Sequence, residues 1–285
     1  MTEPSLREHI ASDGYRLKFR HWAPENPRGI VIALHGIQSH SGWYDYSSRR
    51  MAEAGFAVYF PDRRGSGLNG LQRGHAAHGM RLVNDVRSLR QLAVDEIQGT
   101  AASGVPLPIT ILGISWGGKL AAALAALFPQ EFDRVALLYP GLVARISPTW
   151  SQLLRLNLAR DLEIVKHHIP IPLEDPALFT QVPEWQSFIA NDPLALHTVS
   201  SSFLNAGREL DRLLKIHGSK IIHPTLLMLA EDDAIINNAA VRQRVNQFGT
   251  RKLKTQVYAA ARHTLEFEPN REEVFGDLVT WLSNS

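Results

Sequence analysis

The 285 residues suffice for one large α/β domain with an insertion, or for two small domains. Hydrophobic residues make up 45% and charged residues 20%, as in ordinary globular proteins. A net charge of +2 without a dense Lys/Arg run argues against a nucleic-acid partner. The absence of Cys excludes disulfides, thiolate metal sites and cysteine nucleophiles. The polar N-terminus does not resemble a signal peptide and no apolar run is long enough to span a bilayer, so we expect a cytoplasmic location.

The predicted elements begin with two strands, Leu6–Ile10 and Tyr15–Trp22, joined by a turn at Ser12-Asp13-Gly14. Unbroken apolar runs then recur along the chain, and such runs suit strands that are buried on both faces of a parallel sheet. These runs are Gly29–Leu34, Phe56–Phe60, Ile109–Leu112, Val135–Tyr139 and Thr225–Leu229. Leu253–Tyr258 alternates between apolar and polar residues, which indicates a strand nearer an edge.

Helical stretches separate these strands near Trp43–Ala54 and Met80–Ile97, and a last helix is expected from about Asn270 to Leu282. Strands that alternate with helices predict an α/β fold with a mostly parallel sheet of about eight strands.

The alternation stops between Pro140 and Pro224, where no clear strand is visible. Prolines break regular structure in the middle of this segment, and further helices are expected at Glu184–Ala190 and Val199–Leu214. An apolar stripe falls on one helical face, formed by Ile146, Trp150, Leu153, Leu154, Leu158, Leu162 and Val165. We therefore divide the chain into an α/β core, residues 1–140 and 224–285, and a helical cap or lid, residues 141–223.

The motif G-x-S-x-G occupies Gly113–Gly117, between a buried strand and an Ala/Leu-rich helix. The chemistry needs this arrangement, because a sharp strand-to-helix turn strains the serine and exposes its hydroxyl. Glycine at 113 and 117 leaves room for the backbone to pass closely. The helix N-terminus adds positive potential where an oxyanion forms. We predict that Ser115 is a nucleophile; a turn that only connects strand to helix is the alternative.

Serine needs a base, and twelve histidines compete for that role. His263 follows the last strand and precedes the last helix, which places it at the carboxyl edge of the sheet, where ligands bind. His223 precedes a strand and belongs at the opposite edge. His75 and His78 have the spacing of a metal pair, but no third ligand is near them, so we interpret them as part of a polar loop and expect no metal site.

The acid that orients the base is expected after the strand Thr225–Leu229, because the chain order serine, acid, histidine is typical of hydrolases with this turn. Glu231, Asp232 and Asp233 are candidates, and three acids together could instead form a solvated loop or a metal site. We prefer Asp233, because Ala234-Ile235-Ile236 leads the chain back toward the core, and keep Asp232 as the second choice. A buried carboxylate beside His263 would hold the imidazole tautomer and stabilise the imidazolium.

Two backbone N–H groups should point at the developing oxyanion. We expect one from Trp116, the residue after the nucleophile, and one from the loop His35-Gly36-Ile37-Gln38. Ile37 is our choice in that loop, because Gly36 lets the backbone turn inward. His35 could be mistaken for a second base, but we interpret it as structural, with its ring hydrogen-bonded to loop carbonyls.

These segments resemble the monoglyceride lipase and lysophospholipase branch of the α/β-hydrolases, of the serine aminopeptidase S33 type. His35–Tyr44 is similar to its loop H-G-x-x-x-H-S-G-R-Y, with Trp43 in place of Arg. Asp62–Gly67 resembles its loop D-x-R-G-x-G-x-S, and Gly113–Gly118 matches G-x-S-x-G-G.

Further along the chain, Asn191–Leu194 resembles a D-P-L segment of that group's cap. Ala230–Ile236 resembles its turn G-x-x-D-x-[IL]-V, an alignment that also selects Asp233, and His263 matches its catalytic histidine. The resemblance covers nearly the whole chain and is loosest in the cap.

The resemblance implies an α/β-hydrolase fold and two-step acyl transfer, in which Ser115 forms an acyl-enzyme that water then hydrolyses without a cofactor. The expected substrates are small to medium lipid-like carboxylic esters such as monoacylglycerols. Lysophospholipase, thioesterase and aminopeptidase-type activities are the alternatives on the same fold. A non-catalytic receptor would have no need for Ser115, Asp233 and His263 together.

The apolar stripe of the cap must be buried against the sheet domain, a ligand or a membrane surface. We predict that part of it, including Trp150 and Leu154, lines the acyl pocket. Peripheral contact of the cap with lipid is the further expectation for partners, beside the small ester substrate.

Overall fold

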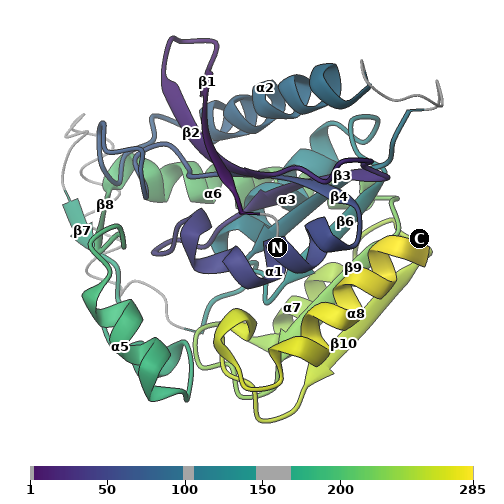
Figure 1. Ribbon diagram of the computed structural model, residues 1–285. Helices are drawn as coiled ribbons and strands as arrows, with labels where there is room; N and C mark the ends of the chain where they lie inside the picture. The colour runs from purple at the N-terminus through teal and green to yellow at the C-terminus, as the bar shows by residue number, and fades with distance from the viewer. Residues whose placement is uncertain (1–2, 99–105, 146–167, 285) are drawn as a thin grey trace.

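The computed structural model describes residues 3–98, 106–145 and 168–284 (Figure 1). Within these residues, eight strands form one sheet in the order β1-β2-β4-β3-β5-β6-β9-β10. The strands are β1 (Ser5–Ile10), β2 (Arg16–Trp22), β3 (Gly29–Leu34), β4 (Phe56–Pro61), β5 (Ile109–Ile114), β6 (Arg134–Leu138), β9 (Thr225–Ala230) and β10 (Leu253–Tyr258). The expected α/β fold is confirmed.

The strands from β4 to β10 are parallel, and β1 and β2 form an antiparallel hairpin at the other edge. Every residue of β3, β4, β5 and β9 is buried, because helices cover both faces of these strands. β10 lies at the edge, as its alternating pattern predicts. Parallel pairing brings the carboxyl ends of β3, β5, β6 and β9 to one edge, and this edge carries the candidate site.

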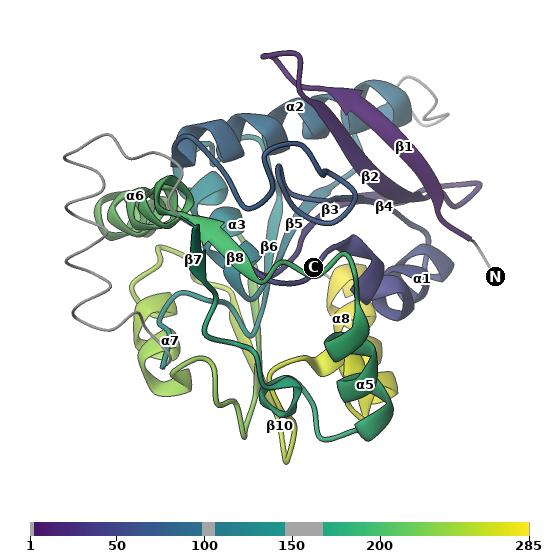
Figure 2. The ribbon, with the colours of Figure 1, turned by 90° about the vertical axis from the view of Figure 1, so that its left-hand side faces the viewer.

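Helices α1 (Asp45–Glu53) and α8 (Arg271–Asn284) cover one face of the sheet, and α2 (Gly79–Gln98) and α3 (Trp116–Leu127) cover the other (Figures 1 and 2). The sequence does not reveal α7 (Asn238–Val245), which follows β9. This helix is short and buries only Val241 and Val245, so it carries no apolar stripe that a sequence pattern could show.

The segment between β6 and β9 contains α5 (Pro183–Asn191) and α6 (Ser201–His217), close to the two helices expected there. The expectation that it contains no strand is wrong. β7 (His168–Pro170) and β8 (Thr198–Ser200) form a small antiparallel sheet. Strands of three residues are too short to show as a periodic pattern. The apolar stripe with Trp150 and Leu154 lies outside the described residues.

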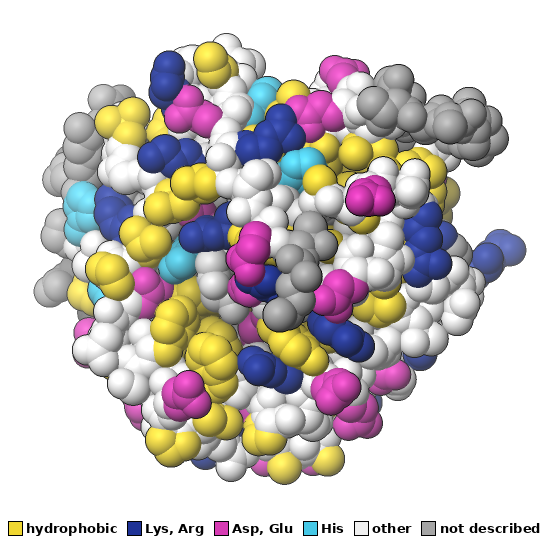
Figure 3. Space-filling view, viewed as in Figure 1, with side chains coloured by type: hydrophobic (Ala, Val, Ile, Leu, Met, Phe, Trp, Pro, Cys, Tyr) yellow, Lys and Arg dark blue, Asp and Glu magenta, His cyan; other side chains and the backbone are white. Residues whose placement is uncertain are grey.

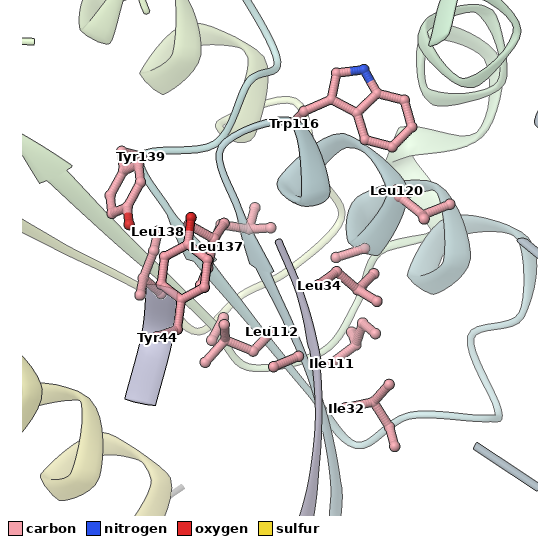
Figure 4. Close-up of a cluster of buried hydrophobic side chains, with 14 of the residues drawn as sticks. Ile32, Leu34, Tyr44, Ile111, Leu112, Trp116, Leu120, Leu137, Leu138 and Tyr139 are labelled. Carbon is pink, nitrogen blue, oxygen red and sulfur yellow. The ribbon is translucent and has the colours of Figure 1, made fainter. Parts of the chain in front are cut away.

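Large apolar side chains pack beneath the candidate site, from β3, β5 and β6 (Figure 4). Trp116, at the start of α3, lies above this cluster, and Tyr44 and Tyr139 lie on its other side (Figure 4). The core thus supports the strand ends directly, which limits their movement.

Acidic and basic side chains are interspersed over the face shown in Figure 3, without a dense field of one sign. Among the described helices, none has the length and apolar character that crossing a membrane requires.

Candidate active site

Ser115 stands at the sharp turn between β5 and α3. Its backbone is in a conformation that L-residues avoid, with φ 51° and ψ −123°. The surrounding backbone holds it there: the Ser115 N–H donates to the Leu138 carbonyl (3.0 Å), and the Ser115 carbonyl accepts from the N–H groups of Gly118 (2.8 Å) and Gly141 (2.6 Å). The strain expected of this turn is therefore present.

Two glycines make the turn sterically feasible, as the motif predicts. A Cβ on Gly117 would lie 2.2 Å from the Leu34 carbonyl oxygen, and one on Gly113 would lie 2.6 Å from the Ala121 Cβ. Both distances are far below van der Waals contact, so any other residue would push the serine turn away from β3 or α3.

A continuous line of hydrogen bonds joins Ser115 to His263 and Asp233. Ser115 Oγ lies 2.9 Å from His263 Nε2, and His263 Nδ1 lies 2.7 Å from Asp233 Oδ2. The other carboxylate oxygen of Asp233 accepts the N–H groups of Ile235 (2.8 Å) and Ile236 (2.9 Å). With Nδ1 donating to the carboxylate, Nε2 is left to accept the serine proton.

The imidazole of His263 is enclosed, with 2% of its surface exposed. The rings of Tyr139 and Phe179 meet it edge-on, at centroid distances of 4.9 and 6.1 Å. Tyr139 follows β6, whereas Phe179 belongs to the segment between β7 and α5. Ring contacts from two separate segments therefore restrict the imidazole, which helps to keep Nε2 directed at Ser115.

The structure also brings Ile37 and Trp116 to Ser115. Gly36 lies so close that a Cβ on it would be 3.3 Å from the Ser115 Cβ. The hydrogen bonds between described residues use neither the Ile37 N–H nor the Trp116 N–H. Two donors beside a nucleophile, without acceptors among these residues, are what an oxyanion requires.

His35 is buried, and burial holds its pKa well below the usual range, so the ring is neutral. Its Nδ1 donates to the Gly36 carbonyl (2.8 Å), as expected for a structural histidine. The expectation of carbonyl partners is wrong for the other nitrogen, because Nε2 accepts the backbone N–H of Arg63 (2.8 Å).

A pocket with a volume of about 260 Å³ opens at Ser115. Its walls are mainly apolar, and Lys119, Arg208 and Asp211 add charged groups. The apolar lining comes from Ile37, Ala144, Ile171, Pro172, Leu173, Leu204, Ile235 and Ile236. The sequence interpretation missed the contribution of α6, although Leu204, Gly207, Arg208 and Asp211 have the i, i+3, i+4, i+7 spacing of one helix face.

The segment before β8 is tied to the loop that contains Ile37. Asp192 Oδ2 accepts the indole N–H of Trp43 (2.6 Å) and lies 3.0 Å from His40 Nε2. Burial alone would raise the pKa of Asp192, but the hydrogen bonds from His40 and Trp43 outweigh it and lower the pKa to about 2. Trp43, which stands where the resembled loop has Arg, thus supplies a donor to Asp192.

Solved structures of other proteins share the fold of this chain. A monoglyceride lipase structure from Saccharomyces cerevisiae superposes with a TM-score of 0.84 at 20% identity, covering 99% of this chain and 96% of that one. The monoacylglycerol lipase structure of Paleococcus ferrophilus gives 0.81 at 22% identity, covering 93% and 98%. These likenesses show the α/β-hydrolase fold.

A monoacylglycerol lipase of Mycolicibacterium smegmatis is 28% identical over 274 residues, 94% of this chain and 93% of the relative. The family model described as serine aminopeptidase, S33, matches residues 25–270. The chain belongs to this family of hydrolases, and it is an enzyme.

Proposed function

We propose that the protein is a serine carboxylester hydrolase in which Ser115 is the nucleophile, His263 the general base and Asp233 the acid that orients it. The hydrogen-bonded line from Ser115 Oγ through His263 to Asp233, at a strained strand-to-helix turn, carries this proposal. The three residues come from three distant parts of the chain, and packing alone would not require them to meet in this order.

In the proposed reaction His263 Nε2 takes the proton of Ser115 Oγ as that oxygen attacks the ester carbonyl. The carbonyl oxygen becomes negative and accepts the N–H groups of Ile37 and Trp116. Collapse of the tetrahedral intermediate expels the alcohol, which takes the proton from His263 and leaves an acyl-serine. Water then attacks the acyl group, giving its proton to His263, and the acid leaves as Ser115 regains its proton.

Lipid-like esters are the proposed substrates, with monoacylglycerols as the model class. The apolar walls of the pocket suit an acyl chain, and its charged residues suit a polar head group. Its volume of about 260 Å³ favours one short or medium chain. The names of the relatives, monoacylglycerol and monoglyceride lipase, point to the same class. We keep residues 141–223 as the proposed cap over this pocket.

Labelling with a fluorophosphonate probe tests the nucleophile. The parent protein should be labelled once, on Ser115, and Ser115→Ala should lose labelling and several orders of magnitude of ester hydrolysis. Ser187→Ala, on an exposed surface of α5, is the matched control and should behave as the parent. Labelling at another residue, or activity retained in Ser115→Ala, would contradict the assignment.

A panel of substrates tests the proposed class. Nitrophenyl esters of increasing chain length and monoacylglycerols should be hydrolysed faster than a lysophospholipid, an acyl thioester or an amino-acid amide. A preference for one of the last three would replace the ester proposal while leaving the nucleophile assignment intact.

A further inference from the structure

Arg63 is a buried cation beside the candidate oxyanion hole. Its side chain follows β4, the residue is 8% exposed, and burial lowers its pKa to about 9, so it stays charged at neutral pH. Within the described residues, no carboxylate lies within ion-pair distance of its guanidinium. Burying an arginine without a carboxylate partner is costly, so its other contacts must compensate.

Those contacts are two carbonyl groups of the loop after β3. Arg63 Nη1 donates to the Gly36 carbonyl and Nη2 donates to the Ile37 carbonyl, each at 2.9 Å. The planar fork of the guanidinium therefore bridges two consecutive peptide groups. A lysine ammonium has a single nitrogen and cannot reproduce two bonds from separate nitrogens of a planar fork.

The first of these bonds bears directly on the Ile37 donor. The Gly36 carbonyl and the Ile37 N–H belong to one planar trans peptide, so they point in opposite directions. An arginine that holds the carbonyl on one side thereby directs the N–H to the other side. Donation from a cation also polarises the peptide, which makes its N–H a stronger donor.

The same guanidinium also contacts the side chain of Trp116, the residue that carries the second donor. The guanidinium lies 4.9 Å from the ring of Trp116 and 4.9 Å from the ring of Phe203, and these two rings stack at 4.8 Å. Phe203 belongs to α6, so the cation contacts both halves of the candidate oxyanion hole and the helix that borders the pocket.

We propose that Arg63 is a positioning residue that orients the Ile37 N–H, and through its ring contact the Trp116 residue, toward the oxyanion. The proposal rests on the proposed acyl-transfer function. Arg63 does not touch the reacting atoms; it acts through the two peptide groups of the loop and through the indole.

The neighbouring Arg64 provides a matched control. It is buried to the same degree, at 7% exposed, but its guanidinium bonds Asp85 instead of the loop. Arg63→Lys, Arg63→Met and Arg64→Lys should be compared on a short nitrophenyl ester. Rates are expressed per site that a fluorophosphonate labels after complete reaction.

We expect kcat of the two Arg63 variants to fall by about 10- to 100-fold with little change in KM, a part of the loss seen when a donor is removed outright. Arg64→Lys should lose thermal stability but keep kcat. The decisive measurement is inhibition by an alkyl trifluoromethyl ketone, whose adduct with Ser115 carries an oxyanion. Its affinity should weaken by the same factor as kcat/KM in the Arg63 variants only.

Equal behaviour of Arg63→Lys and Arg64→Lys, or an unchanged ketone affinity, would overturn the positioning role. If Arg63→Met does not fold, Phe203→Leu tests the same role, because Phe203 contacts the Arg63 guanidinium. It should lower kcat several-fold and weaken ketone affinity by the same factor as kcat/KM. A parent protein that is not labelled at Ser115 would instead refute the proposed function. Labelling with unaltered ketone binding would refute the role of Arg63 alone.

Discussion

Asp232 and Asp233 are adjacent in the chain but differ in burial and in their hydrogen-bond partners. Asp233 is 2% exposed, contacts His263 and accepts two backbone N–H groups, whereas the side chain of Asp232 is exposed. The backbone N–H of Asp232 bonds the Ala261 carbonyl, which anchors the turn from the other side. One residue step along a turn thus decides which carboxylate faces the imidazole.

Asp233→Asn should lower kcat by about 10²- to 10⁴-fold, because the amide cannot hold His263 in the tautomer that accepts the serine proton. Asp232→Asn is the matched control and should remain close to the parent. Steady-state hydrolysis of a short nitrophenyl ester measures both. A crippled Asp232→Asn with a nearly normal Asp233→Asn would assign the role to Asp232.

Glu266 provides a second prediction for a single residue. It is buried and accepts the N–H of Ser47 (2.9 Å), and burial raises its pKa from 4.5 to about 7. Between these values the unfolded chain releases a proton that the folded protein keeps. Rising pH therefore favours the unfolded state, and the contribution of Glu266 to stability falls from pH 4.5 to pH 7.

Glu266→Gln should remove the decrease in stability that Glu266 causes as pH rises. The unfolding free energy of the variant relative to the parent should therefore rise by up to about 3 kcal/mol between pH 4.5 and pH 7. Urea unfolding at several pH values measures the difference, and the exposed Glu272→Gln should follow the parent. A constant difference across this range would show that Glu266 ionises alike in both states.

At the scale of elements, the loop before α1 and the segment after α5 meet through Trp43 and Asp192. The Trp43 ring also packs edge-on or tilted against Phe179, Phe188 and Phe267, so apolar contacts accompany the hydrogen bond of its indole N–H. The carboxylate of Asp192 is thereby held over the loop that carries Ile37. This contact links the proposed cap to the candidate oxyanion hole.

Trp43→Phe should destabilise the protein by about 1.5–3 kcal/mol, the usual contribution of a hydrogen bond to a charged group, while much of the ring packing survives. A double-mutant cycle with Asp192→Asn should give a coupling of about 1–2 kcal/mol in urea unfolding. Trp185→Phe, which also loses an indole that packs on Phe267, serves as the control and should not couple to Asp192→Asn. Additive effects of Trp43→Phe and Asp192→Asn would show that the bond contributes nothing.

At the scale of the whole molecule, the pocket lies between α6 and the loops at the carboxyl edge of the sheet. Neither part lines it alone: Ser115 follows β5, Ile235 lies in the loop after β9, and Leu204 belongs to α6. α3 and α6 meet through the stacked rings of Trp116 and Phe203, and Trp116 also lines the pocket beside the nucleophile.

Specificity should rise with acyl-chain length until the pocket is full and then fall, by up to about fourfold in kcat/KM for each buried methylene. Leu204→Trp should fill the pocket and shift the optimum to shorter nitrophenyl esters, whereas Ile216→Trp on the exposed face of α6 should not. Trp150→Ala and Leu154→Ala test the prediction that these residues line the pocket too, and they should also move the optimum. If kcat/KM did not vary with chain length, and none of these substitutions changed that, the pocket would not select the acyl chain.

Local pattern determined much of the fold. The runs Gly29–Leu34 and Thr225–Leu229 identify strands because a position buried on both faces accepts only apolar side chains. Ser115 and His263 could be selected because G-x-S-x-G needs one backbone geometry and because the carboxyl edge of a parallel sheet gathers its loops. The sequence pattern did not predict the β7–β8 pair or α7. Three-residue strands and a helix with two buried residues show no hydrophobic periodicity.

The sequence by itself therefore determined the α/β class and the parallel core, and it selected the candidate nucleophile and base from their places along the chain. It reduced the acid to neighbouring carboxylates, and the tertiary structure shows that Asp233 is the one that contacts His263. Only the tertiary structure decided that Arg63 bridges the Gly36 and Ile37 carbonyls, that His35 accepts an N–H from Arg63, and that α6 lines the pocket. These contacts join side chains from separate elements. Their geometry follows from how the elements pack and leaves no mark in local sequence.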